Sequence, residues 1–310
     1  MVGCEQEVLS GKRRFLEMRF RIVRLIREFF DKEGFLEVDT PVLTSAPAPE
    51  PHIEPVPAGS GKFLVTSPEL YMKRLLAAGF EKIYQITPAF RSGERGRLHH
   101  PEFSILEWYR SGADYKYLQE DCQRLVRAVC SAPGLVSCLH RGGDRLDFEG
   151  EWMRHTVRSA FATFAGWEPG PDPDQDRFDL DMVEKVEPNL GFPRPCFLED
   201  YPVSQAALAR VKPDDPEVAE RFELYWAGVE LANGFSELTD PAEQRARFEI
   251  ALAHKQQITG IYYPLPEAFL QSLHTLGPCA GIAFGVDRFV MLVTGADDLD
   301  SVVAFPPESA

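Results

Sequence analysis

The segment from Phe90 to Tyr109 carries the residues with the clearest chemical potential. If residues 102–110 form a strand, side chains alternate between its two faces, so Phe103, Glu107 and Tyr109 share one face. An aromatic ring, a carboxylate and a phenol in one row can stack a base and hold an ammonium group. The alternative is an amphipathic strand from which Glu107 points to solvent.

A second segment, Arg221–Glu237, contains two glutamates on either side of a predicted two-residue hairpin turn at 226–227. That register places Glu223 directly opposite Glu230, and like charges in such positions destabilise a sheet. A divalent cation between them would reverse this effect. Mg²⁺ prefers one or two carboxylates together with phosphate oxygens and water, as in an ATP complex. A different register, with one glutamate in solvent, is the alternative.

A third segment has almost no side chains along one face of a predicted strand. Gly281, Ala283 and Gly285 share that face, and a bare strand lets a ligand or another backbone approach closely. Arg288 follows at a predicted helix start, where its planar cation suits a phosphate or the adenine ring. A glycine-rich packing contact is the alternative.

A fourth segment, Thr66–Tyr71, places Glu69 in the first turn of a predicted helix. A carboxylate there favours the helix dipole, which is a purely structural role. Its functional role would be to bind an α- or β-amino group of a substrate.

The elements that must position these groups are strands mixed with helices, without a regular alternation of the two. This pattern predicts an α+β fold around a mostly antiparallel sheet flanked by helices. We expect an N-terminal extension over residues 1–11, a catalytic domain over 12–310 and an accessory insert at about 131–181. The expected helices are 12–32, capped by Ser10, 68–78 and 287–293, and the expected strands are 35–38, 82–91, 102–110, 222–225, 229–235 and 281–285.

Composition limits the classes of partner. The 310 residues include 33 Lys and Arg against 48 Asp and Glu, a net charge of −15 that disfavours broad nucleic-acid binding. No stretch reaches the roughly 20 apolar residues that a membrane helix needs. The N-terminus lacks a secretory pattern, so we expect a cytoplasmic protein that does not associate with membranes.

Together these segments resemble the signature motifs of class II aminoacyl-tRNA synthetases. Phe35–Leu43 resembles motif 1, the dimer-interface strand, Phe90–Tyr109 resembles motif 2, and Gly281–Arg288 resembles motif 3. The resemblance covers nearly the whole chain from about residue 12 and implies a homodimer formed through the motif 1 region. Three stretches are similar to the lysyl branch of the class: residues 67–75, 99–103 and 230–238.

One subgroup of that branch resembles this chain further. Motif 1 begins within the first 40 residues, which leaves no room for the anticodon-reading OB-fold of a lysyl-tRNA synthetase. We therefore expect no tRNA binding. Tyr201–Ala206 and Ala283 are similar to the stand-alone paralogues that attach (R)-β-lysine to a lysine of elongation factor P. The resemblance implies an ATP-dependent ligase that forms a lysyl or (R)-β-lysyl adenylate.

The resemblance also implies roles at the nucleotide. Arg91 would hold the α-phosphate and Arg288 the γ-phosphate as the catalytic pair, Phe103 would stack on adenine, and Glu223 and Glu230 would hold Mg²⁺. The ATP site would further include Ser92, Gly93, Glu94, His100, Glu230, Leu231 and Gly285.

At the amino acid, the resemblance implies that Glu69, Tyr109 and Glu237 hold the substrate, with Glu107 and Asn233 nearby. Ser67, Pro68 and Ala283 complete the implied substrate set. The sequence departs from the family at Gly93, where a glutamate is usual and Glu94 follows, and at His100, where Asn is usual.

Three other functions fit the same motifs. The first is a truncated lysyl-tRNA synthetase that still charges tRNA. The second is an amide-forming ligase of the asparagine synthetase type. The third is a regulatory paralogue without catalysis, against which the intact set of Arg91, Glu223, Glu230 and Arg288 argues.

Overall fold

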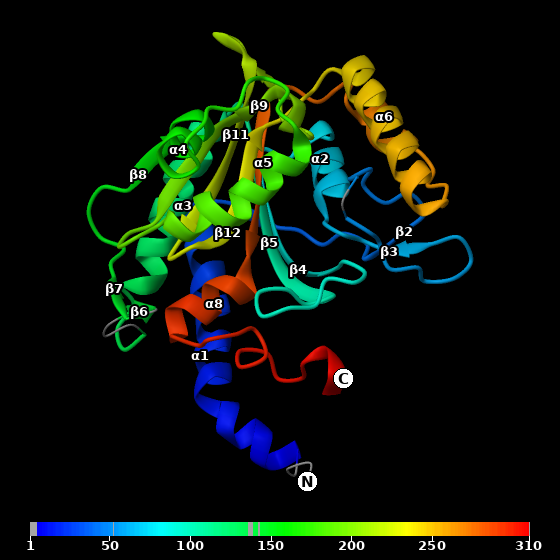
Figure 1. Cartoon of the computed structure of the whole chain (residues 1–310). Coiled ribbons are helices and arrows are strands. Elements are labelled where there is room, and N and C mark those ends of the chain that lie inside the picture. The colour runs from blue at the N-terminus through cyan, green and yellow to red at the C-terminus, as the bar shows by residue number, and fades with distance from the viewer. Residues whose placement is uncertain (1–4, 52, 136–138, 142, 310) are drawn as a thin grey trace.

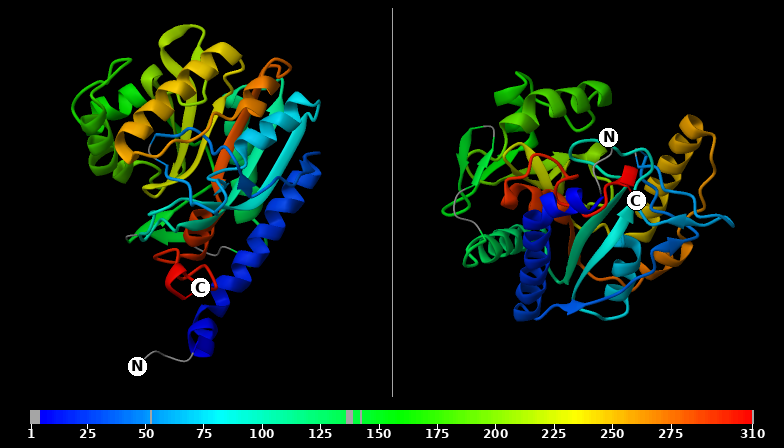
Figure 2. Two further views of the ribbon diagram at one scale, coloured as in Figure 1. Left: turned by 90° about the vertical axis from the view of Figure 1, so that its right-hand side faces the viewer. Right: turned by 90° about the horizontal axis from the view of Figure 1, so that it is seen from below.

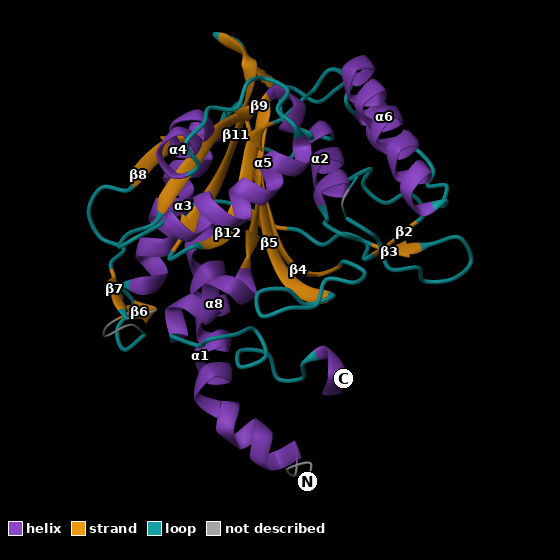
Figure 3. Ribbon diagram, in the orientation of Figure 1, coloured by secondary structure: helices purple, strands orange, loops and turns teal. Residues whose placement is uncertain are grey.

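The computed structural model describes residues 5–51, 53–135, 139–141 and 143–309. These residues form an α+β domain in which helices cover both faces of one large sheet (Figures 1 and 3). The helices are α1 (Glu5–Lys32), α2 (Glu69–Ala77), α3 (Tyr115–Cys130), α4 (Val157–Phe164), α5 (Gln175–Asp181), α6 (Pro241–Thr259), α7 (Glu267–Ser272) and α8 (Val286–Thr294). The strands are β1 (Leu36–Glu37), β2 (Leu43–Thr44), β3 (Phe63–Leu64), β4 (Lys82–Phe90), β5 (Glu102–Ser111), β6 (Leu139–Arg141), β7 (Asp144–Leu146), β8 (Met153–Thr156), β9 (Cys196–Pro202), β10 (Val211–Lys212), β11 (Asp215–Trp226), β12 (Val229–Ser236) and β13 (Cys279–Gly285).

The large sheet has the order β1-β4-β5-β13-β12-β11-β9-β8 among the described residues, with β10 paired to β11. Its outermost pairs, β1 with β4 and β8 with β9, are parallel, whereas the central pairs are antiparallel. The predicted mostly antiparallel sheet is therefore confirmed. The strands of motifs 2 and 3 are direct neighbours at its centre.

The first helix begins earlier than its sequence pattern predicts. It starts at Glu5, and Ser10 lies exposed inside the helix, so the predicted N-cap at Ser10 is wrong. Glu5 and Glu7 in the first turn favour this longer helix because they complement its dipole. Residues 5–11 of the predicted N-terminal extension thus continue into α1, which projects from the body of the molecule (Figure 2).

The two faces of the sheet pack against different helices. Leu106 and Trp108 of β5 face the main hydrophobic core, into which α1, α3 and α8 also direct buried side chains. Tyr109, on the opposite face, packs with α2, α6 and α7 in a second core. At the far end of the sheet, α4 and α5 cover a third core that includes Tyr225. Between the second and third cores, the sheet face carries the polar residues of the motifs.

The segment from Met153 to Gly191, called the insert below, extends beyond the predicted insert at about 131–181 and reaches back to the central hairpin. In the insert, β8 pairs with β9 of the large sheet, and the chain then forms α4, α5 and two short helical turns. The backbone N–H groups of Ala227 and Gly228 donate to the carbonyl oxygens of Gly191 and Leu190, both at 2.9 Å. The insert therefore supports the turn between β11 and β12. Across the part of the chain that the structure describes, no helix has the length and apolar character needed to cross a bilayer.

Candidate active site

Four neighbouring strands bring the motif residues into rows on one sheet face. Glu107 of β5 pairs with Ala283 of β13, Ala283 pairs with Asn233 of β12, and Asn233 pairs with Glu223 of β11. A second row lies two residues further along each strand, on the same face of the sheet. It consists of Tyr109, Gly281, Phe235 and Arg221. Glu107 is only 1 % exposed, so the prediction that it faces inward is confirmed and the solvent-facing alternative is excluded.

The register of the central hairpin differs from the predicted one. The turn is Ala227–Gly228, with φ values of 53° and 71°, and it places Glu230 opposite Tyr225 instead of Glu223. The predicted direct pairing of the two glutamates is therefore wrong. A β-bulge next to Leu224 then shifts the register by one residue and places Glu223 opposite Asn233. Two successive positive φ angles are typical of a type I′ turn, whose second position favours glycine, here Gly228.

The two glutamates nevertheless share one electrostatic environment. Burial and the charge of Glu230 raise the pKa of Glu223. Arg221 and Tyr225 donate to the Glu223 carboxylate, each at 2.7 Å. Burial would also raise the pKa of Glu230, but Arg288, Arg91 and Arg221 together outweigh this effect and hold that pKa below its usual value. Within the described ranges, no group of three or more His, Cys, Asp or Glu could hold a metal alone. A carboxylate pair fits Mg²⁺, which takes its other ligands from phosphate and water.

Both motif arginines reach this environment. The Arg288 guanidinium donates to the carbonyl of Glu230 at 2.9 Å and to its carboxylate at 3.1 Å. Arg91 lies over the Phe103 ring, 5.0 Å from the ring centre, and its charge also lowers the pKa of Glu230. Arg91, Arg288, Glu223 and Glu230 are thus gathered in one region, as binding of a single triphosphate requires.

A buried lysine occupies the other end of the site. Lys73 of α2 is 0 % exposed, and its Nζ lies 2.6 Å from Glu69 and in ion-pair contact with Glu237. Glu107 accepts hydrogen bonds from the hydroxyls of Ser67 at 2.6 Å and Tyr109 at 2.8 Å. Three carboxylates therefore surround a single resident ammonium group.

Two carboxylates of this pocket have raised pKa values. Burial and the charge of Glu69 raise the pKa of Glu107 to about 8. Burial likewise raises the pKa of Glu237 to about 8, despite the opposing charge of Lys73. With Glu69, Glu107 and Glu237 all ionised and Lys73 protonated, the pocket carries two uncompensated negative charges. Such a pocket is complementary to a ligand with two cationic groups.

Gly281, the first residue of motif 3, makes room for the side chains of Tyr109 and Glu237. A Cβ atom at Gly281 would lie 2.5 Å from Oε1 of Glu237 and nearer still to the ring of Tyr109. Only glycine at this position allows both side chains to lie over β13.

A comparison with known proteins assigns the family. The family described as tRNA synthetases class II (D, K and N) matches residues 8–309. The chain belongs to this family. It is 40 % identical over 309 residues to the elongation factor P--(R)-beta-lysine ligase of Vibrio cholerae, covering 94 % of both chains. The protein of the same name from Edwardsiella ictaluri is 40 % identical, with 94 % of both chains covered. That from Proteus mirabilis is 39 % identical, and the match covers 92 % of this chain and 93 % of the relative.

The loop of motif 2, between β4 and β5, is held by contacts with neighbouring segments. The Ser92 N–H donates to the carbonyl of Glu54 at 2.7 Å, Gly93 has φ +78°, and Glu94 lies 3.9 Å from Arg91. The His100 ring is buried and bonded at 2.7 Å to Asp300, whereas the preceding histidine contacts Arg288. The other predicted ATP-site positions, Leu231 and Gly285, lie beside the hairpin bulge and at the start of α8.

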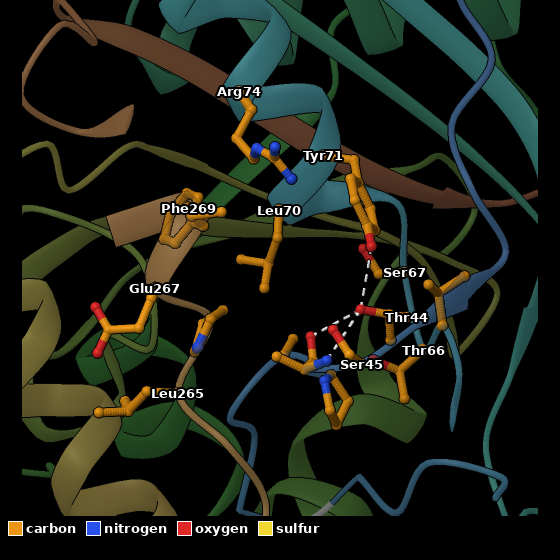
Figure 4. A pocket seen from close by; sticks show the side chains of 16 residues that line it. Thr44, Ser45, Thr66, Ser67, Leu70, Tyr71, Arg74, Leu265, Glu267 and Phe269 are labelled. Carbon is orange, nitrogen blue, oxygen red and sulfur yellow. Dashed lines mark hydrogen bonds between the residues drawn. The ribbon is translucent and has the colours of Figure 1, made fainter. Parts of the chain in front are cut away.

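A cavity of about 250 Å³ adjoins the amino-acid end of the site (Figure 4). Thr44, Tyr71, Arg74 and Phe269 are among its lining residues, and Tyr71 donates to the Thr44 hydroxyl at 3.1 Å. Ser67 forms part of the lining and also bonds to Glu107, so this residue separates the cavity from the carboxylate pocket. Pro68 follows it as the N-cap residue of α2.

Several residues of the site escaped the sequence analysis. Lys73 lies one helical turn after Glu69, and Arg221 lies on the same strand face as Glu223, so helix and strand periodicity could have found both. His99, whose ring nitrogen lies 2.6 Å from Arg288, was quoted only as part of a motif. Glu187 of the insert accepts a hydrogen bond from Tyr225 at 3.1 Å, and no local pattern marks it.

Proposed function

We propose that this chain activates lysine or (R)-β-lysine as an adenylate and transfers it to a lysine side chain of elongation factor P. The names of its relatives, at about 40 % identity over nearly the whole chain, support this proposal. The single observation that carries it is the charge count of the buried pocket. Lysine and β-lysine each bring two ammonium groups, the number needed to neutralise Glu69, Glu107 and Glu237 beside Lys73.

At the amino-acid end, the proposed contacts follow from the sheet rows. Glu69 and Glu237 hold the ammonium groups together with Tyr109, and Glu107 and Asn233 lie alongside. Ser67 and Pro68 fix the start of α2. The small Ala283 leaves space above β13 for the substrate backbone.

At the nucleotide end, Arg91 holds the α-phosphate and Arg288 the γ-phosphate, while adenine stacks on Phe103. Glu223 and Glu230 hold Mg²⁺, which neutralises phosphate charge when bound. The substrate carboxylate attacks the α-phosphate in line, forming the adenylate and releasing pyrophosphate. Positioning and charge neutralisation by the two arginines supply most of the acceleration.

We further propose that the protein acts in the cytoplasm as a homodimer formed through the motif 1 region. Large apolar side chains there are exposed in the single chain, including Leu36 at 52 % and Leu43 at 41 %. Burial of such side chains favours association. The net charge of −15 weakens binding to tRNA phosphates, which favours a protein acceptor over tRNA.

The deciding experiment incubates the protein with ATP, Mg²⁺ and either lysine isomer in the presence of purified elongation factor P. Mass spectrometry should show one added aminoacyl group on the factor. Parallel reactions with tRNA and with ammonia test the alternative acceptors. Charging of tRNA, or an amide formed from ammonia, without modification of the factor would refute the proposal.

A further inference from the structure

The transfer step needs a base that the signature motifs do not supply. A lysine ε-amine has a pKa near 10.4, so it is almost entirely protonated at neutral pH and cannot attack a carbonyl. A carboxylate beside the adenylate carbonyl could take that proton. In the proposed complex, this carbonyl lies between Arg91, which holds the α-phosphate, and Glu69, which holds an amino group.

The charges of both residues act on Glu50. This glutamate belongs to the loop that connects β2 to β3, and its carboxyl also experiences the charges of Glu94, after β4, and of Lys255 on α6. Burial, opposed by the charge of Arg91, raises the pKa of Glu50 above its ordinary value. Among the residues that the structure describes, none forms a hydrogen bond or ion pair with the Glu50 carboxylate.

The loop is held in this position from two sides. Lys255 donates to the carbonyl of Glu50 at 3.2 Å and to that of Ile53. The Ser92 N–H, next to Arg91, donates to the carbonyl of Glu54, and the Tyr263 hydroxyl bonds to the Glu54 carboxylate. The backbone that carries Glu50 is therefore fixed to α6 and to the motif 2 loop, while its carboxylate stays available.

We propose that Glu50 binds the ammonium group of the acceptor lysine and removes its proton during aminoacyl transfer, an inference that rests on the proposed function. The freed nitrogen lone pair forms a C–N bond to the adenylate carbonyl carbon. The bond from that carbon to the phosphate oxygen breaks, and AMP leaves with the electron pair. Glu50 takes the first proton, and the second proton of the amine passes to solvent as the amide forms.

The test compares two nucleophiles on the same adenylate. Hydroxylamine is neutral at pH 7 and needs no base, whereas the acceptor lysine does. Glu50→Gln should keep ATP–pyrophosphate exchange and hydroxamate formation within a fewfold of the wild type, while transfer to the acceptor lysine falls about 100-fold or more. Glu50→Asp should recover part of the lost transfer.

Glu54→Gln is the matched control, because it makes the same change in the same loop at a carboxylate bonded to Tyr263. Its ratio of transfer to hydroxamate formation should equal that of the wild type. An unchanged ratio in Glu50→Gln overturns the inference, as does an equal loss of exchange and transfer. Absence of ATP–pyrophosphate exchange with both lysine and (R)-β-lysine in the wild type rejects the proposed function itself, and the inference with it.

Discussion

Replacing Glu237 by Gln tests the charge count of the amino-acid pocket. The Glu237 side chain is fully buried, and its charge partner in the absence of substrate is Lys73, which also pairs with Glu69 at 2.6 Å. The variant keeps the side-chain volume and the Lys73–Glu69 pair but removes one of the two surplus negative charges. Truncating one member of a buried charge pair costs about 2–5 kcal/mol. At 1.36 kcal/mol per factor of ten, the KM for lysine or β-lysine should rise about 30- to 5,000-fold.

The assay is ATP–pyrophosphate exchange with either the amino acid or ATP varied. The KM for ATP should stay near the wild-type value, because Arg91, Arg288 and Glu230 lie at the other end of the site. Glu220→Gln is the control. Glu220, on β11, is buried as Glu237 is, but it pairs with Arg210 at 2.7 Å instead of with Lys73. Equal increases in both KM values, or no increase for the amino acid, would refute the assignment of Glu237.

Three other outcomes are expected. Arg91→Ala should abolish ATP–pyrophosphate exchange driven by lysine or β-lysine, and near-wild-type exchange would remove this arginine from the mechanism. Because the pKa values of Glu107 and Glu237 are raised to about 8, these groups lose their protons only as the pH approaches 8. The KM for the diamino acid should therefore fall as the pH rises from 7 to about 8, and a KM that rises over this range would contradict the charge count. Gly191→Ala should lower the melting temperature by several degrees, because its Cβ would lie 2.6 Å from the Cα of Trp226. Gly260→Ala, with a similar φ and open space around it, should cost much less, and equal losses would argue against a clash.

Local periodicity predicted the parts of this site that depend on one strand or helix. The alternation along residues 102–110 gave the correct face for Glu107 and Tyr109, because both lie in an uninterrupted strand. The strands of motif 2 end within one residue of their predicted bounds. The residues of motifs 2 and 3 meet because β5 and β13 pair directly, a long-range pairing that no local pattern in the sequence marks.

The failures have specific physical causes. The register of the β11–β12 hairpin depends on which residues adopt positive φ and on a bulge, so a turn placed one residue early moved Glu223 opposite the wrong partner. Lys73 was missed because its ion pair with Glu237 joins residues far apart in the sequence. Its spacing of four residues from Glu69 was visible in the sequence. Glu187 reaches the site only through the packing of the insert, and the start of α1 depended on acidic residues that lie before the amphipathic stretch.

The hydrogen bonds from Ala227 and Gly228 to Gly191 and Leu190 have a practical consequence for protein engineering. The hairpin that carries Glu223 and Glu230 ends against the insert, so the two cannot be exchanged independently between homologues. A recombination crossover between residues 191 and 227 would take the insert from one homologue and the hairpin from another. The two segments would then not necessarily fit each other at these hydrogen bonds. Crossovers before Met153 or after Ser236 would transfer both segments as one block and should give a higher fraction of active chimeras.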